Sequence, residues 1–189
     1  MKISLSPIKL KILQTFLLHD KALKPIEISK ELGIKFPSVM MHIIGLTRME
    51  YLISPEKGFY TITAEGKRGL GLPEMTKELA RKLLVGKLDN SAFHFYLDID
   101  KPLDIKVINL QTFNAQLKTV PVKSIDFHMK RGDFEAWFKG LGDLELAKKT
   151  GLLRKQSFCG ELLRRKLQIL IVNRIMVLAK IAGFSVVKK

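Results

Sequence analysis

The chain has 189 residues, of which 47% are hydrophobic and 27% charged. This composition excludes an intrinsically disordered protein and leaves room for one large or two small domains. Lys and Arg outnumber Asp and Glu by 33 to 18, for a formal net charge of +15, which favours a polyanionic partner such as nucleic acid or an anionic membrane surface. The alternative is a lysine-rich surface that only keeps the protein in solution. The single cysteine, Cys159, excludes an intrachain disulfide and a zinc site built on several cysteines.

The chain shows no targeting or membrane-spanning segment. Its N-terminus has neither the apolar core nor the small-residue cleavage site of a secretory signal. The longest apolar stretch, near residues 169–172, is too short to cross a bilayer. We therefore expect a cytoplasmic protein with no membrane partner.

The first third of the chain has the pattern of three short helices followed by a β-hairpin. The first helix begins after Ser6, a capping residue followed by proline. The second ends at Gly33, which adopts the left-handed conformation of a turn at little cost. A third helix over residues 37–50 and two strands over residues 51–63 complete the pattern. The Gly- and Pro-rich residues 69–73 then mark the end of a domain at residues 1–72.

Short motifs in this domain resemble those of winged helix-turn-helix regulators of the MarR and ArsR kind, of archaeal type. The most specific is the run Tyr60-Thr61-Ile62-Thr63-Ala64-Glu65-Gly66, which closes the hairpin. The others are Glu27-Ile28-Ser29, Leu32-Gly33-Ile34, Pro37-Ser38-Val39, His42-Ile43 and Leu46. The resemblance implies that residues 37–50 enter the major groove of duplex DNA and that the hairpin contacts the flanking backbone or minor groove.

The resemblance also implies a set of DNA-binding residues. They are Lys35, Phe36, Ser38, Met41, His42, Gly45 and Arg48 in the third helix, Lys57 in the hairpin, and Lys67 and Arg68 just beyond it. Ser38 and His42 would hydrogen-bond to bases or phosphate, and Met41 would touch a thymine methyl group. The pattern departs from that of a strong sequence reader, because Met40, Met41 and Ile44 stand where Arg, Asn or Gln is usual. An adaptor that binds a protein partner through this helix is therefore the alternative, and RNA also stays open as the nucleic acid.

The rest of the chain predicts a connecting helix within residues 73–90 and an α+β effector or dimerisation domain over residues 91–189. Alternation of apolar and polar residues predicts strands over residues 91–100 and 122–129, the first ended by Lys101-Pro102. Helices are expected after Asn109, Asp133 and Asp143. The last helix, about residues 158–181, is apolar on most faces, which predicts the spine of the domain or a homodimer interface. The fold class is α+β: a winged helix-turn-helix plus a mixed α/β domain with a long apolar C-terminal helix.

One further motif lies in the second domain. Phe127-His128, Arg131-Gly132-Asp133-Phe134-Glu135 and Trp137 form an FHxxRGDFExW pattern, which resembles that of an uncharacterised archaeal and bacterial domain family. The resemblance implies no activity.

Chemistry in the second domain depends on whether the two expected strands pair. If they do, His94 and His128 share a face with a carboxylate as a metal site, and a metal-dependent enzyme centred on these two histidines is a further alternative function. Arg131 and Asp133 would extend the pair as a ligand site. The alternative is a pair of structural histidines beside a helix cap with local ion pairs. The chain has no phosphate-binding glycine loop, nucleophile elbow or zinc-protease motif. We therefore expect no enzyme and no cofactor, but a homodimeric transcriptional regulator that binds duplex DNA.

Overall fold

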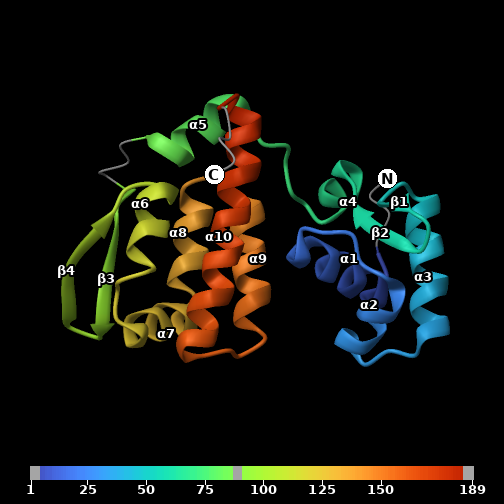
Figure 1. Ribbon diagram of the computed structural model, residues 1–189, viewed down its shortest axis with the longest axis horizontal. Coiled ribbons are helices and arrows are strands. Elements are labelled where there is room, and N and C mark those ends of the chain that lie inside the picture. The colour runs from blue at the N-terminus through green and yellow to red at the C-terminus, as the bar shows by residue number, and fades with distance from the viewer. Residues whose placement is uncertain (1–4, 87–90, 185–189) are drawn as a thin grey trace. The chain divides into compact units, whose positions relative to one another are not determined.

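The computed structural model describes residues 5–86 and 91–184 (Figure 1). The chain divides into two compact units, Met1–Glu74 and Met75–Lys189, called here the N-terminal and C-terminal units. Each unit combines helices with a two-stranded antiparallel sheet, which confirms the α+β class. Among the helices of the described residues, none is long and apolar enough to cross a membrane.

Three helices and a hairpin make up most of the N-terminal unit. In chain order the elements are α1 (Pro7–His19), α2 (Pro25–Leu32), α3 (Phe36–Arg48), β1 (Leu52–Glu56), β2 (Phe59–Ile62) and α4 (Ala64–Gly69). Ser6 caps α1 by accepting a hydrogen bond from the backbone N–H of Lys9, and Gly33 ends α2 with a φ of 64°. The helices bury one stripe each around a shared core, formed by Ile12, Leu13, Phe16, Leu17, Ile28, Val39, Ile43 and Leu46.

The β1–β2 hairpin is anchored to the helices by backbone hydrogen bonds. Leu23, just before α2, forms an antiparallel bridge with Tyr60 of β2, and both of its N–H···O bonds are 2.9 Å long. The register between β1 and β2 shifts between Ile53 and Glu56, and such an irregularity locally bends the strand that carries it. The bridge therefore fixes the hairpin beside the start of α2.

The most specific motif of the domain has a structural role. Thr63 caps α4, accepting from the backbone N–H of Gly66 at 3.0 Å while its hydroxyl donates to the carbonyl of Glu50 at 2.6 Å. Gly66 has no space for a side chain, because a Cβ atom there would lie 2.3 Å from the carbonyl oxygen of Tyr51. The Thr-x-x-Gly spacing thus closes the hairpin against the end of α3, through a short helix that the sequence pattern did not predict.

Helices and a second hairpin form the described part of the C-terminal unit. They are α5 (Lys77–Val85), β3 (Phe93–Asp98), β4 (Lys101–Val107), α6 (Leu110–Gln116), α7 (Val122–Arg131), α8 (Asp133–Gly140), α9 (Leu144–Arg154) and α10 (Gly160–Ala182). The β3–β4 hairpin packs against α7 on one side of the unit, and α10 packs against α5, α6, α7 and α9 (Figure 1). Asn109 and Asp143 cap α6 and α9 as expected. Lys101 and Pro102 begin a second strand rather than end the sheet, after a turn in which Asp100 has a φ of 59°.

The expectation of a strand over residues 122–129 is wrong, because these residues form helix α7. The buried residues of α7 are Ser124, Ile125, His128 and Met129, which have the i, i+1, i+4, i+5 spacing of one helix face. The apparent alternation of Ile125, Phe127 and Met129 was coincidental, since Phe127 is only half-buried. Burial against the hairpin and α10 selects the helical period.

The last helix was expected to be apolar, and therefore buried, on most faces, but in the structure of this chain only one side of it is buried. Helix α10 is 23 residues long, but its buried residues, Leu163, Leu167, Leu170, Ile171, Arg174, Leu178 and Ala182, follow one stripe. Five other apolar side chains are exposed: Leu162, Ile169, Val172, Met176 and Val177. A helix on the outside of a unit buries only the side that its neighbours cover, whatever the composition of the other side.

A buried ion-pair network joins α9 to α10. Arg174 donates two hydrogen bonds to Asp143, at 2.9 and 2.7 Å, and lies 3.1 Å from Glu145. Lys149 reaches Glu145 at 3.0 Å. Arg174, Asp143 and Lys149 are at most 3% exposed. Two cations and two carboxylates therefore balance one another, as buried charges require, and the side chain of Glu145 alone among them is partly exposed, at 12%.

Candidate functional site

Helix α3 exposes an apolar face. Pro37, Met40, Met41, Ile44 and Arg48 recur at three- and four-residue intervals, so they lie on one side of the helix. Met41 is 61% exposed and Ile44 is 41% exposed. Phe36, at the start of the helix, is 44% exposed. The opposite side of α3 is completely buried in the core of the N-terminal unit. Within the described residues of the N-terminal unit, the outward face of α3 is therefore accessible to a binding partner.

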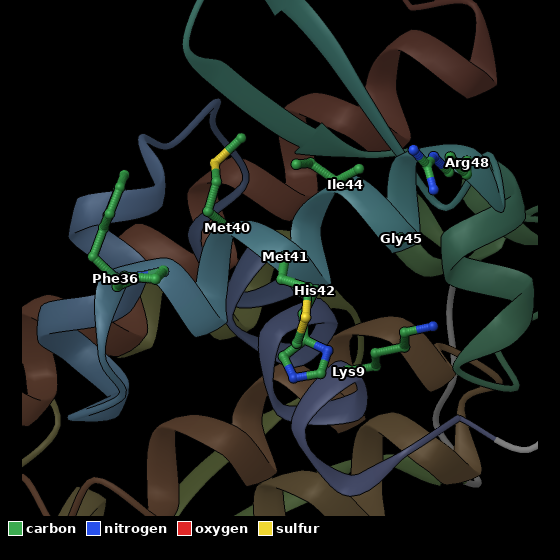
Figure 2. Close-up of a pocket in the computed structure, with 9 residues that line it drawn as sticks. Lys9, Phe36, Met40, Met41, His42, Ile44, Gly45 and Arg48 are labelled. Carbon is green, nitrogen blue, oxygen red and sulfur yellow. The ribbon is translucent and has the colours of Figure 1, made fainter.

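Two depressions flank this face. The first is lined by Lys9, Phe36, Pro37, Met40, Met41, His42, Ile44, Gly45 and Arg48 (Figure 2). The second is lined by Lys24, Pro25, Ile26, Phe36, Met40, Lys57, Gly58, Phe59 and Tyr60. Phe36 and Met40 line both, so the depressions adjoin. Figure 2 shows Met40 on the hairpin side of α3, and the His42 ring on the side of Lys9. We call the two depressions together the α3 surface.

The rim of the α3 surface is positively charged. Among its lining residues, all of which the structure describes, four are Lys or Arg and none is Asp or Glu. Lys9 extends from α1 across Gly45, and its ammonium lies 3.6 Å from the sulfur of Met49. Lys24 stands 4.9 Å above the ring of Phe59 in the hairpin. The first turn of α3 contains no acidic residue either, so the positive end of its dipole is not offset. This combination suits a polyanion.

The structure brings together six of the ten residues implied as DNA-binding. Phe36, Met41, His42, Gly45, Arg48 and Lys57 line the α3 surface. Lys35, Ser38, Lys67 and Arg68 do not line it. Arg68 forms an ion pair with Glu65 on its own helix, and this hydrogen-bonded pairing raises its pKa above the ordinary value. A guanidinium that is already paired with a carboxylate attracts a phosphate group less strongly than an unpaired guanidinium does.

Two cations of the α3 surface, Lys9 and Lys24, were not predicted from the sequence. Lys9 belongs to α1 and Lys24 precedes α2, and neither belongs to the helix that the resemblance singled out. The available signal was weak: Lys9 falls outside the buried stripe of α1. Only the packing of α1 beneath α3, and the bridge from Leu23 to the hairpin, place these two side chains beside Met40 and Lys57.

The structure does not bring His94 to His128. His94 lies on the exposed face of β3, whereas Phe93 and Phe95 on the opposite face are buried. His128, on α7, is 3% exposed and packs edge-on against Phe93 and Phe95. The sheet therefore separates the two imidazoles. Within residues 5–86 and 91–184, no group of three or more His, Cys, Asp or Glu side chains could hold a metal ion.

Both ring nitrogens of His128 have partners. Nε2 accepts a hydrogen bond of 2.8 Å from the backbone N–H of Tyr96, so it carries no proton. Nδ1 then donates to Asp133 at 2.7 Å, and Arg131 approaches the same carboxylate at 3.1 Å. This chain of contacts joins α7 to β3 and to the start of α8. The FHxxRGDF part of the motif thus holds the unit together, and its imidazole has no free nitrogen for a ligand.

The stability of the C-terminal unit should fall between neutral and mildly acidic pH. Burial lowers the pKa of His128 below its ordinary value of about 6.5, and the bond to Asp133 offsets only part of this. The unfolded chain therefore binds the proton first as pH falls, so unfolding becomes easier from about pH 6.5 down to the folded pKa. Urea unfolding followed by the fluorescence of Trp137 should show this loss in the wild type. The His128→Gln variant should lack this component, and equal pH slopes in both proteins would contradict the assignment.

Comparison with known proteins provides no relative for this chain. No protein-family model matches it, and neither the curated proteins nor the solved structures contain a significant match. The function must therefore be argued from the α3 surface itself.

Proposed function

We propose that the protein is a winged helix-turn-helix DNA-binding protein, most simply a transcriptional regulator, that contacts duplex DNA through α3 and the β1–β2 hairpin. One observation carries the proposal: the exposed face of α3 lies between four cations from four separate segments, with no carboxylate among the lining residues. The order of three helices and a hairpin agrees with such a module. The net charge of +15 adds the long-range attraction that nucleic-acid binding uses.

The roles of the cations follow from their positions. Arg48 at the end of α3 and Lys9 beside it flank the first depression, and Lys24 and Lys57 flank the second. With α3 in the major groove, these flanking charges would meet the phosphates on either side of the groove. Phosphate contacts of this kind set position and affinity, and they make binding dependent on salt.

The test compares two triple variants of the full-length protein with the same change in charge. The first replaces Lys24, Arg48 and Lys57 by Gln; the second replaces Lys11, Lys21 and Lys30, which are exposed lysines that do not line the α3 surface. Binding to a labelled duplex is followed by fluorescence anisotropy over a range of salt concentrations. We expect wild-type affinity to fall steeply with salt. The slope of log affinity against log salt should become less negative by about 1 for each phosphate contact that the first triple variant loses.

Two outcomes would overturn the proposal. One is the absence of duplex binding by the wild type even at about 50 mM salt, where non-specific binding is strong. The other is an equal loss of affinity in both triple variants, since net charge rather than the α3 surface would then control binding.

A protein-docking adaptor is the second candidate, because Met41 and Ile44 are exposed apolar side chains. The adaptor function is favoured if neither the wild type nor the first triple variant binds duplex DNA, while both bind the same protein partner.

A further inference from the structure

The outward face of α3 offers few hydrogen-bonding groups to a base edge. From Phe36 to Ile44, five side chains that line the α3 surface have no hydrogen-bond donor: Phe36, Pro37, Met40, Met41 and Ile44. His42 is the exception, and its ring lies on the side of Lys9. Nearby, the hydroxyl of Thr47 is engaged with the carbonyl oxygen of Ile43 at 2.9 Å. Arg48, the outward residue with paired donors, lies at the last position of the helix. The part of α3 that would enter a groove first is therefore mainly apolar, with His42 at its edge.

Base edges differ in how well they accept an apolar side chain. Guanine and adenine are read by paired donors and acceptors of Arg, Asn or Gln, whereas thymine presents a methyl group in the major groove. An apolar side chain packed on a G·C edge would leave polar groups without partners, which is unfavourable. Packed on thymine methyl groups, it removes apolar surface from water on both sides.

We propose that the α3 surface recognises thymine methyl groups, through Met41, Ile44 and Phe36, and so favours A·T-rich duplexes. This rests on the DNA-binding function proposed above and specifies its ligand. The charge of the rim supports a nucleic acid over an apolar protein segment, because four cations and no carboxylate line the surface. The unbranched methionine side chains can adjust to methyl groups at different positions along the groove.

Replacing thymine by deoxyuridine tests the proposal directly, because it deletes the methyl group and keeps every hydrogen-bonding group and phosphate. Affinity of the full-length protein is measured by anisotropy for an alternating dA·dT duplex and for the same duplex with deoxyuridine, at one salt concentration. We expect the deoxyuridine duplex to bind more weakly by about fourfold for each methyl group contacted. A dG·dC duplex should correspondingly gain affinity when its cytosines carry a 5-methyl group.

Variants locate the effect on α3. Met41→Ser and Ile44→Ser remove apolar contacts without changing charge, so the ratio of affinities for the thymine and deoxyuridine duplexes should approach one, with the salt dependence unchanged. Ile8→Ser is the matched control, because Ile8 is an exposed apolar residue of α1 that lines neither depression. It should retain the full ratio.

The outcomes separate this inference from the function on which it rests. Equal affinity of the wild type for thymine and deoxyuridine duplexes, both bound with steep salt dependence, overturns methyl recognition and leaves DNA binding intact. Absence of binding to any duplex overturns both. A ratio that persists in Met41→Ser and Ile44→Ser also overturns the inference, because the methyl group would then act through duplex shape or another surface. That result would leave the apolar face of α3 available to a protein partner.

Discussion

Replacing Arg174 by alanine is expected to lower the free energy of unfolding of the C-terminal unit by about 3–5 kcal/mol. The variant leaves the carboxylates of Asp143 and Glu145 in the interior without the guanidinium that both contact. Asp143 also caps α9 by accepting from the backbone N–H of Leu146 at 3.0 Å, so the start of that helix is weakened too. Urea unfolding followed by Trp137 measures the change, because the only tryptophan of the chain lies in this unit.

Arg165→Ala is the matched control for this prediction. Arg165 belongs to the same helix but is exposed, and surface substitutions usually change stability by no more than about 0.5 kcal/mol. Similar losses in the two variants would mean that helix propensity, rather than the buried network, determines the effect. A loss below about 1 kcal/mol in Arg174→Ala would show that water or a neighbouring cation readily replaces the guanidinium.

Replacing Phe134 by alanine is expected to cost about 3–5 kcal/mol as well. Phe134 is completely buried, and its ring centroid lies 5.2 Å from that of Phe93, 5.3 Å from that of Phe113 and 5.5 Å from that of His128. These rings join the β3–β4 hairpin to α6, α7 and α8, so the alanine variant leaves a cavity where four elements meet. Urea unfolding monitored by circular dichroism at a helical wavelength would measure the loss.

Two further variants complete the Phe134 experiment. Phe134→Leu retains most of the apolar volume and should cost less than the alanine variant, which keeps the prediction testable if Phe134→Ala does not fold. Phe184→Ala removes the same side chain from a position that is 42% exposed and should cost at most about 1 kcal/mol. Equal losses at positions 134 and 184 would contradict the view that the aromatic cluster is the core of this unit.

Local signals predicted where most elements begin and end. Ser6, Asn109 and Asp143 cap helices where the sequence indicated, and Gly33 ends α2 in the left-handed conformation. These features depend on hydrogen bonds and backbone angles within about four residues, so they can be read from a short stretch of sequence. The short helix α4 was missed although its cap, Thr63, belongs to the motif that was noticed, because Gly66 and Gly69 are poor helix formers.

The candidate site was only partly predictable. Phe36, Met41 and Arg48, which the resemblance to winged helix-turn-helix regulators implied, line the α3 surface, whereas Lys35 and Ser38, implied in the same way, do not. Lys9 and Lys24 reach the same surface from other elements, and no pattern within those elements indicates this. The pairing of His94 with His128 was expected from two strands of similar appearance, one of which is a helix.

The sequence by itself determined the α+β class and several helix caps, because the local patterns that indicate helices, strands and caps depend on interactions between near neighbours in the chain. Only the tertiary structure decided that residues 122–131 are helical, that α10 leaves one side uncovered, and that cations from α1, the start of α2 and the hairpin surround α3. The physical reason is that burial depends on which elements pack together. A residue's own neighbours in the chain do not contain that information.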